Sequence, residues 1–286
     1  GIIQFANNTN PHLDSGYTTD DNARALMACI KYYHHFKDVS KLNQIKIYLN
    51  YLNHVQQFDG RILNYVNKDK TLDKERWTED AHGRALWSLG TLLATPNLPQ
   101  EIKSKAQELF KKALLPLRNF TSPRAIAFSI IGISQYQERT NNQENLQTII
   151  ELTERLISHY KDNSTQEWKW FEKYLTYSNS KLTEAMFHAY QTTNNEKYLE
   201  IAEESLNFLN SITFEEDIFV PIGQQGWYLK DGKRAYFDQQ PVDVASMVQT
   251  LITANKITNK DEYMDLALNT FEWFLGKNSL KQIVYN

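Results

Sequence analysis

Apolar residues recur with a helical period along most of the chain, in two different patterns. Five segments are small or apolar on most sides, and each is followed by a segment with one apolar and one charged face. A helix that is apolar all round is surrounded by other elements, whereas an amphipathic helix faces water on one side. We therefore expect five pairs, each of an inner and an outer helix. The predicted inner helices are 20–36, 79–94, 122–138, 180–193 and 243–257, and the outer helices are 40–57, 99–118, 142–162, 196–212 and 260–277.

The connections between the predicted helices differ in length. Within a pair they are short, whereas three connections from an outer helix to the next inner helix are long, at 58–78, 163–179 and 213–242. Long loops without helices are usually functional or disordered, and these contain strand-like segments. Residues 61–66 predict a short strand, and residues 226–237 predict a hairpin that turns at Asp231 and Gly232. All three loops lead into the N-termini of inner helices, so we expect them to share one face.

The pattern as a whole predicts an all-α fold, an (α/α)6-type toroid of inner and outer helices in which this chain supplies five pairs. No linker interrupts the 286 residues, so we expect residues 1–286 to form a single (α/α) barrel domain. Five pairs leave a ring of six incomplete. Either the segment 1–19 helps to close the ring, or the natural protein continues beyond this chain.

Composition excludes several functional classes. The 31 basic and 34 acidic residues give a net charge of -3, and no Lys/Arg stripe indicates nucleic-acid binding. The single cysteine excludes a disulfide framework and a cysteine zinc site. No apolar run approaches the roughly 20 residues that cross a bilayer, and no signal peptide is visible, so we expect a soluble, cytoplasmic protein with no membrane partner. Phosphate-loop, dinucleotide and metalloprotease motifs are missing, and we expect no cofactor and no metal.

Acidic residues gather where the first inner helix is predicted to begin. Asp20 and Asp21 open this helix, Asp14 and Tyr17 precede it, and Arg24 follows one turn later. A capping residue and one carboxylate in the first turn are common at a helix N-terminus, where the helix dipole favours an anion by about 0.3–1 kcal/mol. Capping accounts for one aspartate and leaves the others unexplained. We therefore expect this cluster to line a ligand site, with Arg24 orienting a carboxylate.

The second inner helix repeats this arrangement. Glu79 and Asp80 open it, and Arg84 follows one turn after Asp80, so pairing between acid and arginine within the helix is the structural alternative. Trp77 precedes the acidic pair, where its ring could stack on a sugar or close the rim of the fold. His82 lies on the same helix and is a candidate to reach the ligand.

A third cluster lies in the long loop before residue 180. Trp170 and Tyr177 are two of several aromatic residues around the single carboxylate of Glu172. That much apolar area must pack against the fold or a ligand. A carboxyl group among aromatic rings has a raised pKa and can donate a proton near neutral pH. Glu172 is therefore a candidate acid, and Glu184, one turn inside the next helix, competes with it.

The last long loop combines amide, aromatic and carboxylate side chains, which are typical of carbohydrate recognition. Gln225 and Trp227 lie in its first half, and Asp238 and Gln240 lie near its end. Asp243 stands at the predicted start of the following helix, where its position favours an N-cap. Asp238 and Gln240 have no such structural explanation.

Four of these motifs together resemble a known family. Residues 14–24, residues 79–87, Trp170-Phe171-Glu172 with Tyr177 and Asn179, and residues 240–243 are similar to motifs of the six-hairpin (α/α)6-barrel glycosidase superfamily. Within it, they resemble a bacterial group described as glycosyltransferase-associated or glycosidase-like. The resemblance spans nearly the whole chain. It implies the barrel fold, an oligosaccharide or glycoside ligand and a functional link to a glycosyltransferase, and the group continues into a further inner helix that this chain lacks.

The leading hypothesis is a glycoside hydrolase in which one carboxylate protonates the leaving oxygen and another activates water. An inverting pair stands roughly 6.5–9.5 Å apart. We expect the base among the acids at the helix N-termini and the acid in Glu172 or Asp238. The alternatives are a carbohydrate-binding accessory module beside a glycosyltransferase, and a sugar epimerase in which His82 and His188 transfer protons.

The catalytic candidates are Asp20, Asp21, Glu79, Asp80, Glu172 and Asp238, and the sugar-binding candidates are Asp14, Tyr17, Arg24, Trp77, His82, Arg84, Trp170, Tyr177, Gln225, Trp227, Gln240 and Asp243.

Overall fold

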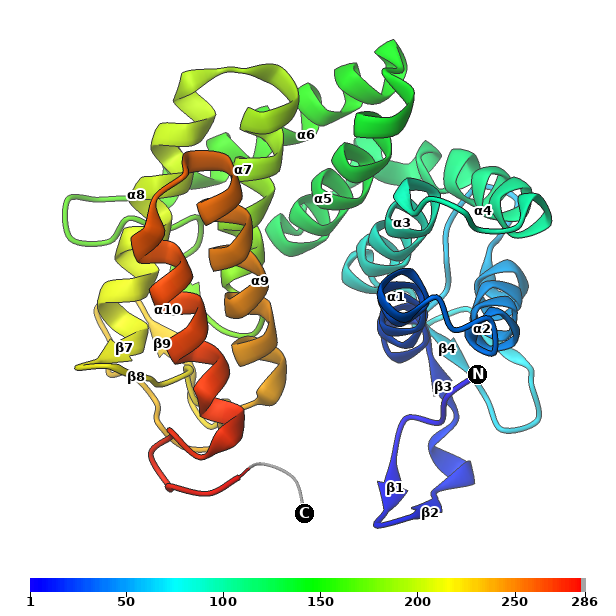
Figure 1. Ribbon diagram of the computed structural model, residues 1–286, viewed down its shortest axis with the longest axis horizontal. Helices are drawn as coiled ribbons and strands as arrows, with labels where there is room; N and C mark the ends of the chain where they lie inside the picture. The colour runs from blue at the N-terminus through cyan, green and yellow to red at the C-terminus, as the bar shows by residue number, and fades with distance from the viewer. Residues whose placement is uncertain (284–286) are drawn as a thin grey trace. The chain divides into compact units, whose positions relative to one another are not determined.

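The computed structural model describes residues 1–283, and this part of the chain contains ten α-helices (Figure 1). The ten predicted helices are confirmed, in the predicted order. The first members of the pairs are α1 (Thr19–Phe36), α3 (Glu79–Ala94), α5 (Pro123–Thr140), α7 (Ser180–Thr193) and α9 (Pro241–Thr258), and the second members are α2 (Lys41–Val55), α4 (Gln100–Ala113), α6 (Gln143–Asn163), α8 (Glu196–Thr213) and α10 (Asp261–Glu272).

Two of the second members end earlier than predicted. Helix α4 is followed by the 3-10 helix η2 (Leu115–Asn119), because Pro116 lacks the N–H that would continue the α-helical hydrogen bonds. Helix α10 is followed by η3 (Trp273–Leu275), and Gly276, with φ 103°, ends the helical turn in a left-handed conformation. The periodicity of apolar residues continues through both 3-10 segments, so it does not mark these ends.

The strands of the described chain are all two residues long and lie in the loops. A two-stranded pair near the N-terminus, a three-stranded sheet in the order β3-β4-β5 and two further pairs, β6-β9 and β7-β8, are all antiparallel. The strands are β1 (Ala6–Asn7), β2 (Asn10–Pro11), β3 (Tyr17–Thr18), β4 (Tyr65–Val66), β5 (Leu72–Asp73), β6 (Tyr174–Leu175), β7 (Phe214–Glu215), β8 (Ile218–Phe219) and β9 (Tyr228–Leu229).

The chain divides into two compact units, Gly1–Ile149 and Ile150–Asn286, and the division falls within α6. The single domain expected from the sequence stays a prediction, and the two units are described one after the other.

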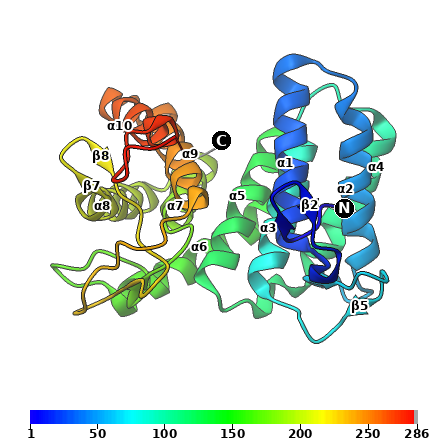
Figure 2. The same ribbon diagram turned by 90° about the horizontal axis from the view of Figure 1, so that it is seen from below.

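In the first unit, α1 packs against α2 and α3, and α3 packs against α4 and α5 (Figure 2). Small residues allow α3 and α5 to approach closely. A Cβ atom on Gly90 would lie 2.0 Å from the carbonyl oxygen of Gly132, so these two positions accept no side chain. Beside them, the rings of Trp87 and Phe128 stack with their centroids 5.8 Å apart. The close approach of the two glycines and the stacked rings place α3 and α5, whose residues are mostly buried, at the centre of the unit.

In the second unit, α7 packs against α8 and α9, and α9 packs against α10. The hairpin predicted for residues 226–237 is only partly present. A turn forms where Gly232 N–H bonds to Leu229 O at 2.9 Å, and Ala235 N–H bonds to Trp227 O at 2.9 Å across the two arms, but the strand β9 itself pairs with β6. The hairpin is incomplete because the edge of β9 bonds to β6, a strand from loop 163–179. No local turn signal in the sequence reveals this pairing. Two of the three long loops are thereby joined.

Candidate functional site

The acid–arginine cluster, as we call it, consists of Asp20, Asp21 and Arg24 in the first turns of α1 and Arg84 of α3. Thr18 is the N-cap of α1, and its hydroxyl accepts the Asp21 N–H at 3.2 Å. The same hydroxyl donates to the Asp21 carboxylate at 2.5 Å, and Arg24 donates to this carboxylate at 2.6 Å. Asp21 therefore completes the cap of its own helix.

Asp20 is held in a different way. Its carboxylate contacts Arg24 of the same helix at 2.8 Å and Arg84 of α3 at 2.6 Å. Arg84 is buried, and its guanidinium lies 4.2 Å from the centre of the Phe128 ring. The Asp20 side chain remains 31% exposed. Two cations thus fix a carboxylate that solvent still reaches, and such a group can orient a water molecule or a sugar hydroxyl.

Glu79 and Asp80 are engaged by the residues that open α5. The Glu79 carboxylate accepts the N–H groups of Thr121 at 2.7 Å and Ser122 at 2.6 Å. The Ser122 hydroxyl donates to Asp80 at 2.5 Å and also caps α5 by accepting the Ala125 N–H. These bonds satisfy donors at a helix N-terminus. The catalytic role expected for Glu79 and Asp80 stays a prediction, and the contacts give both a structural role.

The other sugar-binding candidates near these helices have partners of their own. Asp14 is exposed and forms an ion pair with Lys68 at 2.5 Å, which lowers the pKa of Asp14. Tyr17 lies in β3 and pairs with Val66 of β4. The Trp77 ring packs edge-on against Phe120 at 6.2 Å and lies 5.9 Å from the guanidinium of Arg61.

His82 is buried in the first unit with both ring nitrogens engaged. Its Nδ1 accepts the Ile62 N–H at 3.1 Å, and its Nε2 lies 2.8 Å from the carbonyl oxygen of Ala113, to which it donates. Burial lowers the pKa of His82 to about 4. A sugar hydroxyl would have to displace a backbone bond to reach this ring. These contacts therefore support a structural role for His82.

In the second unit, the aromatic loop forms a local core. Trp170 is fully buried and packs edge-on against Phe171 at 5.4 Å and close to Phe208 at 6.2 Å. Glu172 is buried as well, and its carbonyl oxygen accepts the Trp168 indole N–H at 2.7 Å. The expectation that this apolar area packs against the fold is confirmed. The expectation that Glu172 acts as an acid stays a prediction.

The loop before α9 holds two exposed candidates, Gln225 and Asp238, and two half-buried ones, Trp227 and Gln240. Gln240 donates a hydrogen bond to Gln224. The Trp227 ring lies 6.4 Å from that of Tyr177 and is tilted against it by 53°.

Asp243 is not an N-cap, contrary to the sequence-based expectation. The N-cap of α9 is Gln240, and Asp243 lies one turn further on, where its buried carboxylate accepts the Ser178 N–H. The helix begins earlier than predicted because Pro241 has the backbone angle of a first helical residue. Asp243 therefore ties α9 to the loop that precedes α7.

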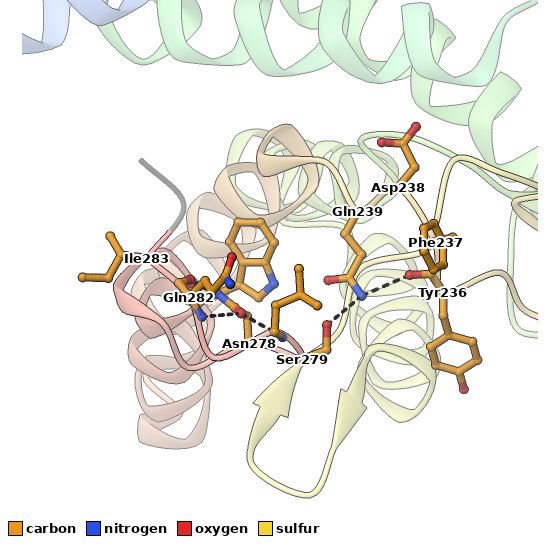
Figure 3. Close-up of a pocket in the computed structure, with 10 residues that line it drawn as sticks. Tyr236, Phe237, Asp238, Gln239, Asn278, Ser279, Gln282 and Ile283 are labelled. Carbon is orange, nitrogen blue, oxygen red and sulfur yellow. Dashed lines mark hydrogen bonds between the residues drawn. The ribbon is translucent and has the colours of Figure 1, made fainter. Parts of the chain in front are cut away.

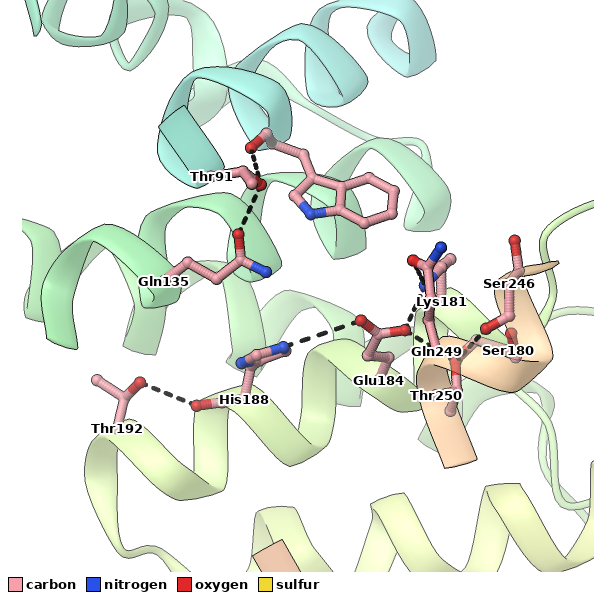
Figure 4. Close-up of polar contacts among 11 residues, drawn as sticks. Thr91, Gln135, Ser180, Lys181, Glu184, His188, Thr192, Ser246, Gln249 and Thr250 are labelled. Atoms are coloured by element: carbon pink, nitrogen blue, oxygen red, sulfur yellow. Dashed lines mark hydrogen bonds and ion pairs between the residues drawn. The ribbon is translucent and has the colours of Figure 1, made fainter. Parts of the chain in front are cut away.

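A buried charged cluster on α7 was largely missed by the sequence analysis (Figure 4). Lys181 donates to Glu184 and, at 2.9 Å, to Gln249 of α9. The Thr250 hydroxyl donates to Glu184 at 2.9 Å, and His188 Nε2 lies 3.9 Å from the other Glu184 oxygen. Burial favours the protonated form of Glu184, but Lys181 and His188 outweigh it and keep the pKa of Glu184 below its usual value. A lysine within an apolar helix gives little sign in the sequence that it is buried.

The second unit also contains a cavity of about 680 Å³, which we call the C-terminal pocket (Figure 3). Among residues 1–283, Asp238 is the one sequence-predicted site residue on its wall, and Trp170 and Trp227 do not line it. The sequence pattern did not indicate the segment that follows α10 as part of a site. The lining residues are Tyr236, Phe237, Asp238, Gln239, Trp273, Asn278, Ser279, Leu280, Gln282 and Ile283.

Within residues 1–283, no three His, Cys, Asp or Glu side chains are grouped so that they could hold a metal ion. No helix of this same range combines the length and the apolar character needed to cross a membrane.

Known structures share the fold of this chain, whereas neither a protein-family model nor a curated protein matches its sequence. A sugar epimerase from a ruminal bacterium is similar with a TM-score of 0.73 and 11% identity, over 94% of this chain and 78% of the other. A D-mannose isomerase has a TM-score of 0.73 and 13% identity, over 96% and 80%. An α-mannanase of Bacteroides thetaiotaomicron has a TM-score of 0.63 and 12% identity, over 91% and 74%. The predicted all-α fold class, that of the (α/α)6-barrel proteins, is therefore confirmed.

Proposed function

We propose that this protein acts on carbohydrates as a glycoside hydrolase and that Asp20 is its general base. The observation that carries the proposal is the Asp20 carboxylate, which Arg24 and Arg84 hold at 2.8 and 2.6 Å while solvent reaches it. A base for glycoside hydrolysis must be a fixed carboxylate that can contact water. The similar folds of a sugar epimerase and an α-mannanase support the class of ligand.

The structure favours Asp20 over the other acids at the helix N-termini. Asp21 caps its own helix, and Glu79 and Asp80 bond to the start of α5. Asp20 has no part in a cap, and its two arginine partners come from different helices. For the acid of the reaction, Glu172 and Asp238 remain our candidates on sequence grounds.

A sugar epimerase is the second candidate, and the histidines give it less support. Proton transfer by histidine needs a ring nitrogen that is free to face the substrate and titrates near the working pH. Both nitrogens of His82 bond to backbone groups. The Nδ1 of His188 has no hydrogen-bond partner among residues 1–283, but this atom is buried, and burial lowers the pKa of His188. An accessory module that only binds sugars is the third candidate, and it would not need Asp20.

Turnover of neutral oligosaccharides by the Asp20→Asn variant tests the proposal. Cellulose and mannan oligosaccharides are suitable substrates, with reducing-sugar release as the readout. Loss of a general base lowers the rate by about 10²–10⁴-fold, whereas binding should remain because the amide is similar in shape. Asp59→Asn is a matched control, since Asp59 forms a comparable ion pair with Arg61 at 2.6 Å away from the cluster.

Three outcomes decide between the candidates. Loss of turnover in Asp20→Asn with normal turnover in Asp59→Asn supports the hydrolase. Parental turnover in Asp20→Asn rejects Asp20 as the base. Binding of sugars by the parent protein without release of reducing sugar rejects the hydrolase. Chromatography of the recovered sugar then separates the other two candidates, since an epimerised product favours the epimerase and unchanged sugar favours the accessory module.

A further inference from the structure

Helix α10 packs against α9 (Figure 1) and also exposes a row of apolar side chains. Leu268 is 59% exposed and Phe271 is 50% exposed. The members of the row follow one another at intervals of four, three and four positions, which is the spacing of a seam along which one helix packs against another. We call this row the α10 stripe, and it consists of Met264, Leu268, Phe271 and Leu275.

The charged residues around the α10 stripe are all acidic. Residues 261–276 contain four acids and no Lys, Arg or His. Glu272 pairs with Lys277 at 3.2 Å, whereas Asp261 and Asp265 are exposed and form no ion pair within residues 1–283. These two aspartates lie one helical turn apart, where like charges repel each other. A surface that covers the stripe is therefore stabilised by positive charges opposite Asp261 and Asp265.

The C-terminal end of α1 carries a surface of the opposite charge. Tyr32 is 44% exposed and Phe36 is 61% exposed, and their rings lie 4.5 Å apart. Residues 31–41 contain three lysines and one aspartate. Lys31 and Lys37 are exposed and form no ion pair in the described part of the chain. We call this surface the α1 patch, and it consists of Lys31, Tyr32, Phe36, Lys37 and Val39.

We infer that the α10 stripe of one copy of this protein packs against the α1 patch of a second copy. The apolar side chains of the two surfaces cover each other, and the lysines of the patch face the aspartates beside the stripe. Contact between two α10 stripes places acids opposite acids, which disfavours it. An anionic membrane surface is disfavoured for the same reason. The inference concerns assembly and does not depend on the role of Asp20.

Two different surfaces meet in this contact, so the copies associate head to tail and form a closed ring or an open chain. Sedimentation velocity of the full chain tests this. We expect the share of oligomers to rise with protein concentration. We also expect the oligomers to dissociate when NaCl is raised from about 50 mM to about 500 mM, because salt screens the exposed charges on both surfaces.

Two double variants each remove one side of the contact. Asp265→Lys/Leu268→Ala changes the α10 stripe, and Lys31→Glu/Phe36→Ala changes the α1 patch. All four side chains are exposed, so we expect both variants to fold, as judged by circular dichroism. Each variant alone should self-associate at least about tenfold more weakly than the parent. An equimolar mixture should form a heterodimer, because one variant keeps the α1 patch and the other keeps the α10 stripe.

Leu115→Ala is the matched control, since Leu115 is as exposed as Leu268 and lies outside both surfaces; it should associate like the parent. If either double variant does not fold, Asp265→Lys and Lys31→Glu alone give the same comparison. A parent that stays monomeric overturns the inference, and so does a mixture without heterodimer. Parental association of the α1-patch variant overturns it in favour of contact between two stripes, and binding of the parent to anionic vesicles through the stripe overturns it in favour of a membrane.

Discussion

His82 allows a sharp test of whether a histidine of this fold is structural or takes part in proton transfer. The change is His82→Gln, which removes the titrating ring and keeps a polar side chain. In the folded protein the pKa of His82 is about 4, against an ordinary value of 6.5, and burial is the main cause. The neutral ring also matches its contacts, because one nitrogen accepts and the other donates a hydrogen bond.

The direction in which the stability changes with pH follows from proton linkage. Below pH 6.5 the unfolded chain takes up a proton on this histidine, whereas the folded protein stays unprotonated until about pH 4. The contribution of His82 to stability is therefore fully present above pH 6.5 and declines as the pH falls. Each pKa unit corresponds to 1.36 kcal/mol, so the parent loses about 2 kcal/mol by pH 5 and about 3 kcal/mol by pH 4 through this residue.

The assay is urea unfolding of the parent and His82→Gln at pH 7, 6, 5.5 and 5. At pH 7 the parent should be the more stable protein, because the variant loses two backbone hydrogen bonds in the core. This difference should shrink by about 2 kcal/mol at pH 5, while other titrating groups cancel between the two proteins. A difference that stays constant with pH, or an imidazole pKa near 6 in an NMR titration, would refute the structural role and reopen the epimerase hypothesis.

Two further predictions concern packing and buried charge. Gly90→Ala should lower the free energy of unfolding by about 1–3 kcal/mol, because the new Cβ would meet Gly132 O at 2.0 Å; an unchanged midpoint in thermal unfolding contradicts this. Lys181→Met should cost about 3–5 kcal/mol by leaving the buried Glu184 without its cation. The double variant Lys181→Met/Glu184→Gln should recover much of this loss in urea unfolding, and equal losses in both would reject a charge effect.

Local signals in the sequence were enough to predict the helices and most of their N-termini. The N-caps of α1 and α3 are Thr18 and Thr78, a residue type that favours this position. Such caps act within a few residues of the chain, and so does the periodicity that marks a helix. The N-terminus of α9 was predicted wrongly because Asp243 is of a residue type that caps helices. In the structure Asp243 accepts the Ser178 N–H, a contact with a distant segment that the local sequence does not show.

Contacts between distant segments were the part that the sequence could not reveal. Pairing of Arg84 with an acid of its own helix was the structural alternative considered, and the structure pairs Arg84 with Asp20, 64 positions earlier in the chain. Likewise, β9 pairs with β6 of another loop, and the pocket uses residues after α10 that show no motif. Each of these depends on how helices pack, and packing is not encoded in any short run of residues.

The neighbouring acids Asp20 and Asp21 at the start of α1 have different roles in the structure. Asp20 and Asp21 are neighbours in sequence and share Arg24 as a partner. Asp21 is nevertheless explained by the cap of α1, which any helix of this kind requires, whereas Asp20 needs a second arginine, the buried Arg84, from another helix. Burying a guanidinium costs free energy unless a carboxylate compensates it. Because Asp20 lies at a solvent-exposed helix end, its ion pair with Arg84 holds the Asp20 carboxylate in one orientation where water reaches it. General-base catalysis needs a carboxylate that is held in this way.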